Sequence, residues 1–187
     1  MAKLLDNSAL LQFLFATNAL KVLALFLRRP TAQLYGNEVM HLTGLSRAGV
    51  NFALRDLAKT KLLTHEKRGK MHFYRLIDNQ PIVRQLKLIM TIALLAPLID
   101  DLKMHTRRVI LYGSAARGED HEESDIDLLI VTREKKIVEN QLRKYSLPQK
   151  FQIIMHTSQE WTKIETENNV FADQVEKGLL LWEAHES

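Results

Sequence analysis

Two short polar motifs in the second half of the chain carry residue types that could bind and activate a phosphate group. Gly113-Ser114 follows the apolar run at 109–112, and the pair Asp125 and Asp127 begins twelve residues after the glycine. Backbone N–H groups and a serine hydroxyl at the start of a helix could grip a triphosphate. The glycine lets a phosphate approach the backbone closely, and the spacing of the aspartates places both carboxylates on one face of a strand.

Two carboxylates side by side repel each other unless a cation lies between them. Hard divalent ions with oxygen ligands, above all Mg²⁺ (or Mn²⁺), meet that need. A metal so placed can bridge phosphate oxygens and activate an attacking hydroxyl. A plainer interpretation stays open, because single Gly-Ser turns and Asp-x-Asp pairs are common and mostly inert. The neighbouring acids Asp120, Glu122 and Glu123 look like an ordinary solvated loop.

These motifs need strands and tight turns to hold them, and the C-terminal part of the sequence alternates in that way. Short apolar runs predict strands, and amphipathic spacing predicts the helices between them. The predicted strands are 108–112, 125–131, 151–156 and 179–182. Residues 113–118 are predicted to be a turn into a helix, and the other predicted helices are 134–145 and one or two within 158–178.

Gly-Ser followed by Asp-x-Asp at this spacing resembles the DNA polymerase β-type nucleotidyltransferase superfamily. The form Gly-Ser-x-x-Arg-Gly at 113–118 is similar to its minimal nucleotidyltransferase branch, and the resemblance covers about residues 105–182. It implies a nucleoside triphosphate as ligand. It also implies that Gly113 and Ser114 bind nucleotide phosphate, that Asp125 and Asp127 are catalytic and hold Mg²⁺, and that Arg117 and Ser124 are nucleotide-binding positions that support the phosphate loop and the metal strand.

The sequence departs from this family at one position. The family pattern usually adds a third carboxylate on a later strand, and here the matching residue is Gln152. An amide binds Mg²⁺ weakly and does not take a proton at neutral pH. His156 could substitute as a base, and the nearest downstream acid is Glu160. Either the reaction needs only two acids, or the site binds nucleotide without turning it over.

The N-terminal part has the element order helix, helix, turn, helix, hairpin. Residues 36–77 resemble a winged helix-turn-helix, which implies double-stranded DNA as a partner. Ser46 is placed to cap the third helix, and Gly69 suits the tip of the hairpin. The predicted helices are 8–28, 36–42 and 47–60, the turn is 43–45, and the predicted strands are 62–65 and 71–76.

The third helix of this module carries the side chains that would read DNA. Val50, Leu54 and Leu57 recur at inward positions, which leaves a polar outer face that fits the major groove. There an arginine can read guanine and an asparagine can read adenine, while a basic hairpin tip holds phosphate. Phe52 could touch a thymine methyl or pack inward. The predicted DNA-binding residues are Ser46, Arg47, Asn51, Arg55, Lys67, Arg68 and Lys70.

The distribution of charge supports two separate roles. Residues 1–80 hold 12 Lys and Arg against 5 Asp and Glu, a net charge of +7, whereas residues 81–187 hold 14 against 17, a net charge of −3. A clustered basic surface is the electrostatic footprint of a nucleic-acid binder. The alternatives are that the basic residues only solvate a surface helix, or that the winged helix contacts protein.

Composition excludes several classes of protein. The 187 residues are 46% hydrophobic and 26% charged, which is ordinary for a globular chain and excludes disordered and fibrous classes. There is no cysteine, so disulfides, thiolate nucleophiles and cysteine-based metal sites are excluded; this fits a cytoplasmic location. Polar residues break the apolar runs of the N-terminus, so we expect neither a secretory signal nor a membrane span there.

Together these elements predict an α+β protein. The expected parts are a winged helix-turn-helix over 1–80, a linker or dimerisation helix over 81–104 that bends at Pro97, and a nucleotidyltransferase-like α/β domain with a small mixed sheet over 105–187. An apolar stripe on the long helix could pair with a second copy to make a homodimer, or it could pack within its own chain. The stripe consists of Leu86, Ile89, Met90, Ala93 and Leu94.

Two functions follow from these modules. The first is a DNA-binding transcriptional regulator whose nucleotidyltransferase-like domain binds a nucleoside triphosphate with Mg²⁺. Toxin–antitoxin and related regulatory systems use both kinds of module, so the resemblance suggests an autoregulatory component with a partner protein. The alternative is an active nucleotidyltransferase that transfers a nucleoside monophosphate to a protein, RNA or small-molecule hydroxyl and releases pyrophosphate.

Overall fold

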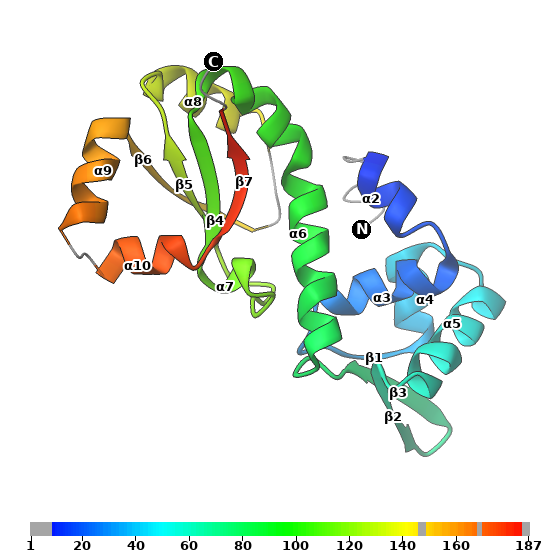
Figure 1. Ribbon diagram of the computed structural model, residues 1–187. Helices are drawn as coiled ribbons and strands as arrows, with labels where there is room; N and C mark the ends of the chain where they lie inside the picture. Colours follow the sequence, from blue (N-terminus) through cyan, green and yellow to red (C-terminus); the bar gives the residue numbers. More distant parts are fainter. Residues whose placement is uncertain (1–8, 146–148, 168–169, 185–187) are drawn as a thin grey trace. The chain divides into compact units, whose positions relative to one another are not determined.

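The computed structural model describes residues 9–145, 149–167 and 170–184. These residues form two compact units, one ending at Leu94 and the other beginning at Leu95, so the division lies inside the long helix α6 (Pro81–Leu102). The first unit has helices and a three-stranded antiparallel sheet, and the second has a mixed four-stranded sheet (Figure 1). This architecture confirms the predicted α+β class.

The first unit consists of four helices, three strands and the beginning of α6 within its described part. The strands pair in the order β1-β3-β2, with all pairs antiparallel. Strand β1 was not predicted; it is short and adds to the outer side of β3. In chain order the elements are α2 (Ala9–Leu14), α3 (Asn18–Arg28), β1 (Gln33–Tyr35), α4 (Gly36–Thr43), α5 (Arg47–Lys59), β2 (Leu63–Arg68) and β3 (Met71–Leu76).

The predicted single helix over 8–28 is wrong, because the structure has two helices separated at Thr17. The Thr17 hydroxyl accepts a hydrogen bond of 3.2 Å from the Leu20 backbone N–H and so caps the start of α3. The cap satisfies one of the donors that a new helix leaves free. Apolar spacing continues across the break, which is why periodicity alone did not reveal it.

The hairpin is longer than the sequence predicted. Strand β2 continues to Arg68, and only Gly69 and Lys70 form the turn. Gly69 has a φ of +59°, a conformation that glycine adopts without strain, so its predicted place at the tip is confirmed. The extra residues pair in register, Glu66 with Phe73, Lys67 with His72 and Arg68 with Met71.

Helix α5 is positioned by a buried apolar side and a capped start. Val50, Leu54 and Leu57 are buried, as predicted, and α5 packs against α3, α4 and β2. The Ser46 hydroxyl accepts a hydrogen bond of 3.2 Å from the Gly49 backbone N–H, which confirms the predicted N-cap. The opposite side of α5 is exposed, so its polar residues are free to face a partner.

The second unit is built on a sheet with strand order β6-β5-β4-β7. Strand β4 is antiparallel to both of its neighbours, and β5 and β6 are parallel. The elements after α6 are the 3₁₀ turn Lys103–His105, β4 (Arg108–Tyr112), α7 (Gly113–Ala116), β5 (Ile126–Val131), α8 (Lys135–Leu142), β6 (Phe151–His156), α9 (Ser158–Thr166), α10 (Val170–Glu176) and β7 (Leu179–Glu183).

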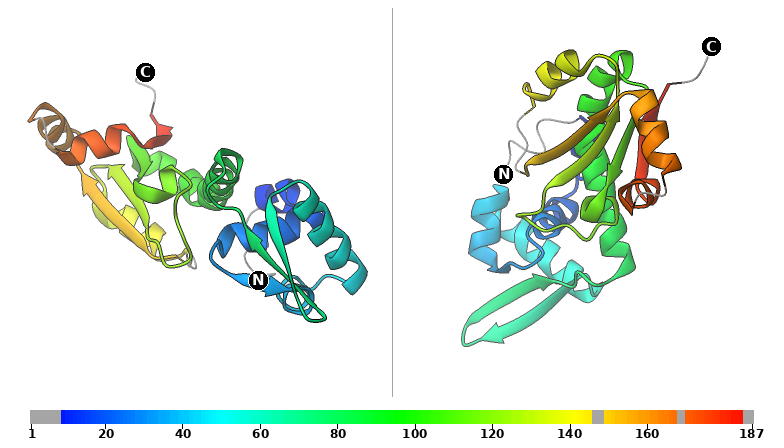
Figure 2. Two further views of the ribbon diagram at one scale, coloured as in Figure 1. Left: turned by 90° about the horizontal axis from the view of Figure 1, so that it is seen from below. Right: turned by 90° about the vertical axis from the view of Figure 1, so that its left-hand side faces the viewer.

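Helices cover both faces of this sheet (Figure 2). On one face Ile110, Tyr112 and Leu129 pack with Trp161 of α9 and Val175 of α10 into a buried cluster. The alternate residues of β4 and β5 point to the other face, where buried side chains of α8 and of the C-terminal part of α6 lie. The Tyr145 hydroxyl after α8 lies 3.0 Å from the Pro97 carbonyl oxygen and 2.7 Å from Asp101 Oδ2, which ties α8 to α6.

Helix α6 is predominantly apolar, with charged residues near both ends, and continues through Pro97. With the following 3₁₀ turn it is long and apolar enough to cross a membrane by length and composition alone, and half of its most apolar window is buried inside the protein. Met90, Ala93 and Leu94 of the predicted dimer stripe are buried within the chain, and Ile89 is exposed. The stripe is therefore used mainly for packing within the chain, and a homodimer stays a prediction.

Candidate nucleotide and DNA sites

The Gly113-Ser114 turn lies at the end of the inner strand β4. The Ser114 carbonyl oxygen accepts hydrogen bonds from the backbone N–H groups of Arg117 and Glu119, which closes the loop after the strand. Helix α7 spans only four residues, so little of a helix macrodipole is available to a phosphate. Any phosphate contact in this turn therefore depends on individual backbone N–H groups and the Ser114 hydroxyl, rather than on the helix start that the sequence suggested.

Gly113 and Asp127 are in close contact across two strands. Tyr112 and Asp127 are directly paired in the β4–β5 register, and a Cβ added to Gly113 would overlap Asp127 Oδ2. Gly113 also has a φ of +72°, which favours glycine. The glycine is thus required twice, by its backbone conformation and by the space that the Asp127 carboxylate occupies.

The two predicted metal ligands are electrostatically coupled. Burial raises the pKa of Asp127, and the negative charge of Asp125 raises that pKa further. Asp127 is half-buried at the start of β5, whereas Asp125 is exposed in the preceding loop. The pKa of Tyr112 is raised by burial and by the Asp127 charge. The ionised form of Asp127 is therefore unfavourable in this site, and a cation bound between the two carboxylates would stabilise it.

Gln152 occupies the position beside Asp127 on the third strand. The parallel register pairs Asp127 with Gln152 and Val131 with His156. His156 lies four positions further along β6, roughly 13 Å away at about 3.3 Å per residue, so it does not reach the carboxylates as a substitute base. The Glu160 carboxylate accepts a 2.7 Å hydrogen bond from the Thr157 backbone N–H and caps α9. Neither side chain replaces the missing acid.

The donor set fits a metal ion only together with a nucleotide. Within the described residues no three His, Asp or Glu side chains are grouped to hold a metal ion. Mg²⁺ prefers six oxygen ligands, keeps several waters, and often binds one or two carboxylates plus substrate phosphates. Asp125 and Asp127 supply the two carboxylates, and the space against Gly113 admits no other side chain. The residues present therefore fit a metal whose coordination phosphate oxygens complete.

Arg117 and Ser124 shape the loop between β4 and β5. Arg117 Nε donates a 2.8 Å hydrogen bond to Glu119 Oε2, and the Ser124 hydroxyl accepts a 2.8 Å hydrogen bond from the His121 backbone N–H. The expectation that the acidic loop is wholly solvated is wrong at Asp120, which is only 8% exposed. Gln149 Nε2 donates to Asp120 Oδ2 at 3.2 Å, and this contact spans 29 residues, so the sequence gave no local sign of it.

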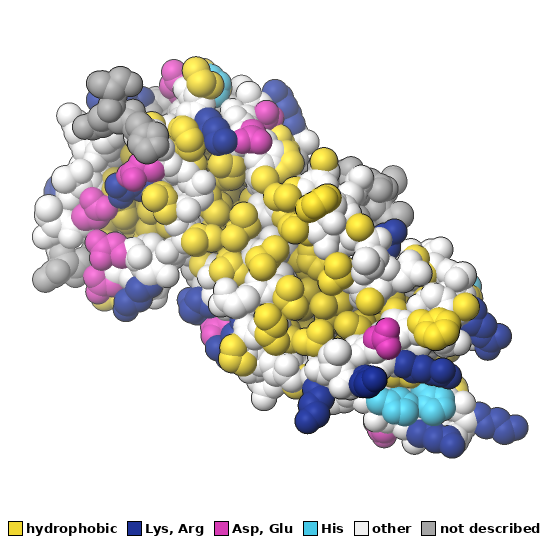
Figure 3. Space-filling model, turned by 45° about the vertical axis from the view of Figure 1, so that its right-hand side comes forward, with side chains coloured by type: hydrophobic (Ala, Val, Ile, Leu, Met, Phe, Trp, Pro, Cys, Tyr) yellow, Lys and Arg dark blue, Asp and Glu magenta, His cyan; other side chains and the backbone are white. Residues whose placement is uncertain are grey.

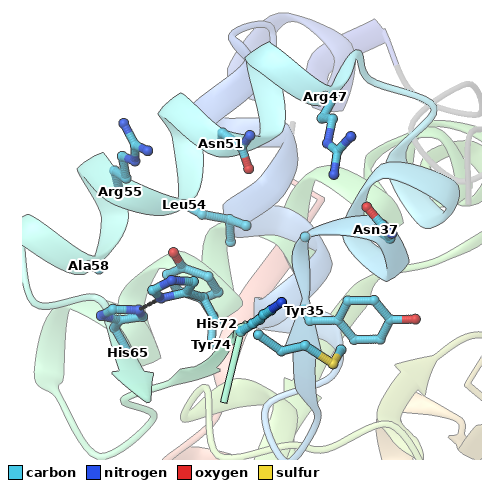
Figure 4. Close-up of a pocket in the computed structure, with 13 residues that line it drawn as sticks. Tyr35, Asn37, Arg47, Asn51, Leu54, Arg55, Ala58, His65, His72 and Tyr74 are labelled. Carbon is cyan, nitrogen blue, oxygen red and sulfur yellow. Dashed lines mark hydrogen bonds between the residues drawn. The ribbon is translucent and has the colours of Figure 1, made fainter. Parts of the chain in front are cut away.

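A groove of about 760 Å³ lies in the first unit between α5, the start of α4 and the hairpin (Figure 4). Four of the predicted DNA-binding residues line it, three of them from α5. The Arg and Lys side chains on its described lining are positively charged, and that described lining includes no Asp or Glu. Its lining includes Arg47, Asn51, Arg55, Lys70, Asn37, His65, His72 and Tyr74.

Three other predicted DNA-binding residues do not line this groove. The Ser46 hydroxyl is engaged as the cap of α5. Arg68 pairs with Glu66 at 2.7 Å and lies over the Phe73 ring, 5.2 Å from its centroid. Because alternate residues of a strand point to opposite faces, Arg68 lies on the hairpin face away from Lys67 and His72. Its charge is already balanced within the hairpin.

Sequence reasoning missed the two histidines of the hairpin. His65 Nε2 and His72 Nδ1 lie 2.5 Å apart with the two rings nearly parallel, and the His65 ring also stacks on Tyr74. The sequence shows one histidine in each predicted strand of the hairpin, but without the strand register it does not show that the two side chains meet. Phe52, whose direction the sequence left open, is 68% exposed on α5, so it does not pack inward.

We expect Asp127→Asn to raise the melting temperature at pH 7. Burial and the Asp125 charge raise the folded-state pKa of Asp127, so the ionised carboxylate destabilises the fold above that pKa. This cost vanishes as the pH falls below the unfolded-state pKa of an aspartate. Thermal unfolding from pH 7 to pH 4 should show that the difference in melting temperature between Asp127→Asn and wild type becomes smaller as the pH falls. The control Glu123→Gln should melt like wild type at every pH. A variant that melts below wild type at pH 7 would contradict this balance of charges.

Comparison with known protein families agrees with the second unit. Residues 99–187 match the family model described as Polymerase beta, Nucleotidyltransferase. The match begins inside α6, before the predicted start at 105, and includes the four strands, the Gly113-Ser114 turn and both aspartates. Proteins of this family generally use a divalent metal. No curated protein matches the chain. Residues 99–187 therefore form a Polymerase beta nucleotidyltransferase domain.

Proposed function

We propose that this protein is a DNA-binding transcriptional regulator whose nucleotidyltransferase domain binds a nucleoside triphosphate with a divalent metal. The observation that carries the DNA-binding part is the groove of the first unit, which Arg47, Asn51 and Arg55 of one exposed helix face line together with Lys70 of the hairpin. The nucleotidyltransferase domain carries the nucleotide part. The regulatory role is assigned by analogy with systems that combine both modules.

In this proposal the first unit is a winged helix-turn-helix. Helix α5 enters the major groove, where Arg47 and Arg55 read guanine and Asn51 reads adenine. The β2–β3 hairpin is the wing, and Lys70 at its turn contacts the phosphate backbone. Support comes from the capped, well-packed α5, whose outer side is exposed along its length.

In the second unit, Gly113 and Ser114 hold the triphosphate, and Asp125 and Asp127 hold the metal. When bound, the metal would supply charge neutralisation for the phosphate oxygens. Arg117 and Ser124 keep the loop between the two motifs in shape through their contacts with Glu119 and His121. Gln152 beside Asp127 leaves the site without a third carboxylate, so the proposal favours nucleotide binding over turnover.

The second candidate function is an active nucleotidyltransferase, and the retained, coupled pair Asp125 and Asp127 favours it. The reaction would join a nucleoside monophosphate to an acceptor hydroxyl and release pyrophosphate. Pyrophosphate release from each of the four triphosphates, in wild type and Asp127→Ala, separates the candidates. Release that depends on Asp127 would establish the enzyme, and equal background rates would leave the binding function.

Restoring the third acid should increase turnover. We expect Gln152→Asp to raise pyrophosphate release by roughly 10²-fold, the usual contribution of a general base, because residue 152 lies in register beside Asp127. Gln152→Asn is the matched control, since it shortens the side chain equally without adding a carboxylate. Equal rates in the two variants would show that β6 no longer supports the reaction geometry.

The wing gives the most direct test of DNA binding by the first unit. We expect Lys70→Ala to weaken binding to all duplex sequences about equally. The slope of the logarithm of affinity against the logarithm of salt concentration should become shallower by about one. Arg68→Ala removes the same charge from the same hairpin, but Arg68 is already paired with Glu66, so its effect should be smaller. Fluorescence anisotropy at several salt concentrations measures the duplex affinity of both variants. A larger loss of affinity for Arg68→Ala than for Lys70→Ala would refute the assignment of Lys70 as the phosphate contact of the wing.

A further inference from the structure

The paired histidines of the hairpin lie on the side that faces the groove. His65 of β2 and His72 of β3 are both exposed, and both line the groove. Figure 3 shows histidine side chains at this end of the first unit, bordered by Lys and Arg side chains. The hydrogen bond between the rings joins His65 Nε2 and His72 Nδ1, which leaves one outer nitrogen on each ring for a ligand.

The hydrogen bond fixes how many protons this pair can hold. In the neutral pair one ring donates to the other, so the accepting ring must carry its own proton on its outer nitrogen. The pair then presents one outer N–H donor and one bare outer nitrogen. One added proton gives a cation with two outer donors and keeps the bridging hydrogen bond, whereas a second would remove the acceptor. The two rings therefore act as a site for a single proton.

The groups around the pair attract an anion. Arg47 and Arg55 of α5 line the groove opposite the hairpin, Lys70 lies at its turn, and Lys67 is paired with His72 in the strand register. Tyr74 stacks beneath His65, and α4 contributes the neutral Asn37. The nearest acid on the hairpin, Glu66, lies on the opposite face, where it contacts Arg68 and Gln33. A ligand with negative charge balances this set.

We propose that His65 and His72 form a phosphate-binding site of the hairpin that takes up one proton when a DNA backbone phosphate binds. The inference rests on the proposed DNA-binding function and adds a contact and its proton linkage. The phosphate accepts hydrogen bonds from the outer nitrogens and stabilises the added positive charge. Because a proton is taken up together with the phosphate, duplex affinity depends on pH.

The test measures affinity for a random-sequence duplex from pH 5.5 to 8.0 at constant ionic strength. With uptake of one proton, affinity falls as the pH rises, by up to about tenfold per pH unit in the steepest range. Calorimetry in buffers of different ionisation enthalpy should count one proton taken up per bound chain. Uptake of more than one proton at any pH, or of none at the pH of the steepest slope, would overturn the proposed site.

Variants separate this site from the other histidines and from simple charge. His65→Gln and His72→Gln should each flatten the pH dependence, while His41→Gln on α4, outside the groove lining, should keep it. Lys70→Ala should lower affinity at every pH and keep the slope. Circular dichroism checks that His65→Gln and His72→Gln fold like wild type. A wild-type slope in either histidine variant refutes the proposal, whereas absence of duplex binding at every pH refutes the proposed function instead.

Discussion

Replacing Asp127 by Asn should remove most of the Mg²⁺-dependent affinity of the nucleotidyltransferase domain for ATP and GTP. The expected loss is roughly 100-fold or more, because even the outer-shell partners of metal ligands contribute about 10–100-fold to metal affinity. Asp127 carries this effect because its carboxylate lies against Gly113 of the Gly113-Ser114 turn and is less exposed than Asp125. Isothermal titration calorimetry with Mg²⁺ and with EDTA measures it.

The same substitution should stabilise the fold, so loss of binding can be separated from loss of structure. Glu123→Gln is the matched control, since it removes an exposed charge from the loop that precedes β5. Gly113→Ala should also lower the Mg²⁺-dependent nucleotide affinity, because the added Cβ would overlap the Asp127 carboxylate. Unchanged nucleotide affinity in Asp127→Asn would show that the two aspartates are not the metal ligands.

Changing Arg47 or Arg55 to Ala should relax sequence specificity as well as weaken binding. If either arginine reads a guanine, its loss should weaken the preferred duplex by about 1–3 kcal/mol, or roughly 5- to 150-fold. Both side chains lie on the exposed side of α5 and line the groove. Selection of the preferred duplex from a random library, followed by anisotropy on preferred and random sequences, measures the difference.

An even loss across preferred and random DNA would mean that these arginines contact phosphate rather than bases, and the assignment of α5 as the reading helix would be wrong. Lys59→Ala is a suitable comparison, because it removes a charge from the last turn of the same helix outside the groove lining. The α5 cap and the buried Val50 and Leu54 stay intact in all three variants.

The elements that hold the nucleotide motifs could be predicted because their signals are local. The strand before Gly113, the strand that carries Asp127 and the strand that carries Gln152 each follow from a short apolar run beside a turn. Their register follows from the family pattern, and the structure places Gln152 directly beside Asp127. The contact between Gly113 and Asp127 could not be predicted, since it depends on packing across two strands.

Long-range contacts account for most of what the sequence did not show. Asp120 is buried because Gln149 bonds to it from 29 residues away. The His65–His72 pair exists because the β2–β3 register continues to Arg68, past the predicted end of the first strand. The break at Thr17 is local, but a single hydroxyl cap is a weak signal within a continuous apolar pattern.

Binding of the full chain to a random-sequence duplex tests the central claim most directly. At 50 mM salt and pH 6, anisotropy should show saturable binding, and the logarithm of affinity should fall linearly with the logarithm of salt concentration, as expected when several phosphates are neutralised. The same sample should bind ATP or GTP in the presence of Mg²⁺, which shows that it is folded. Nucleotide binding without any duplex binding at low salt would contradict the claim that the first unit of this chain is a DNA-binding module.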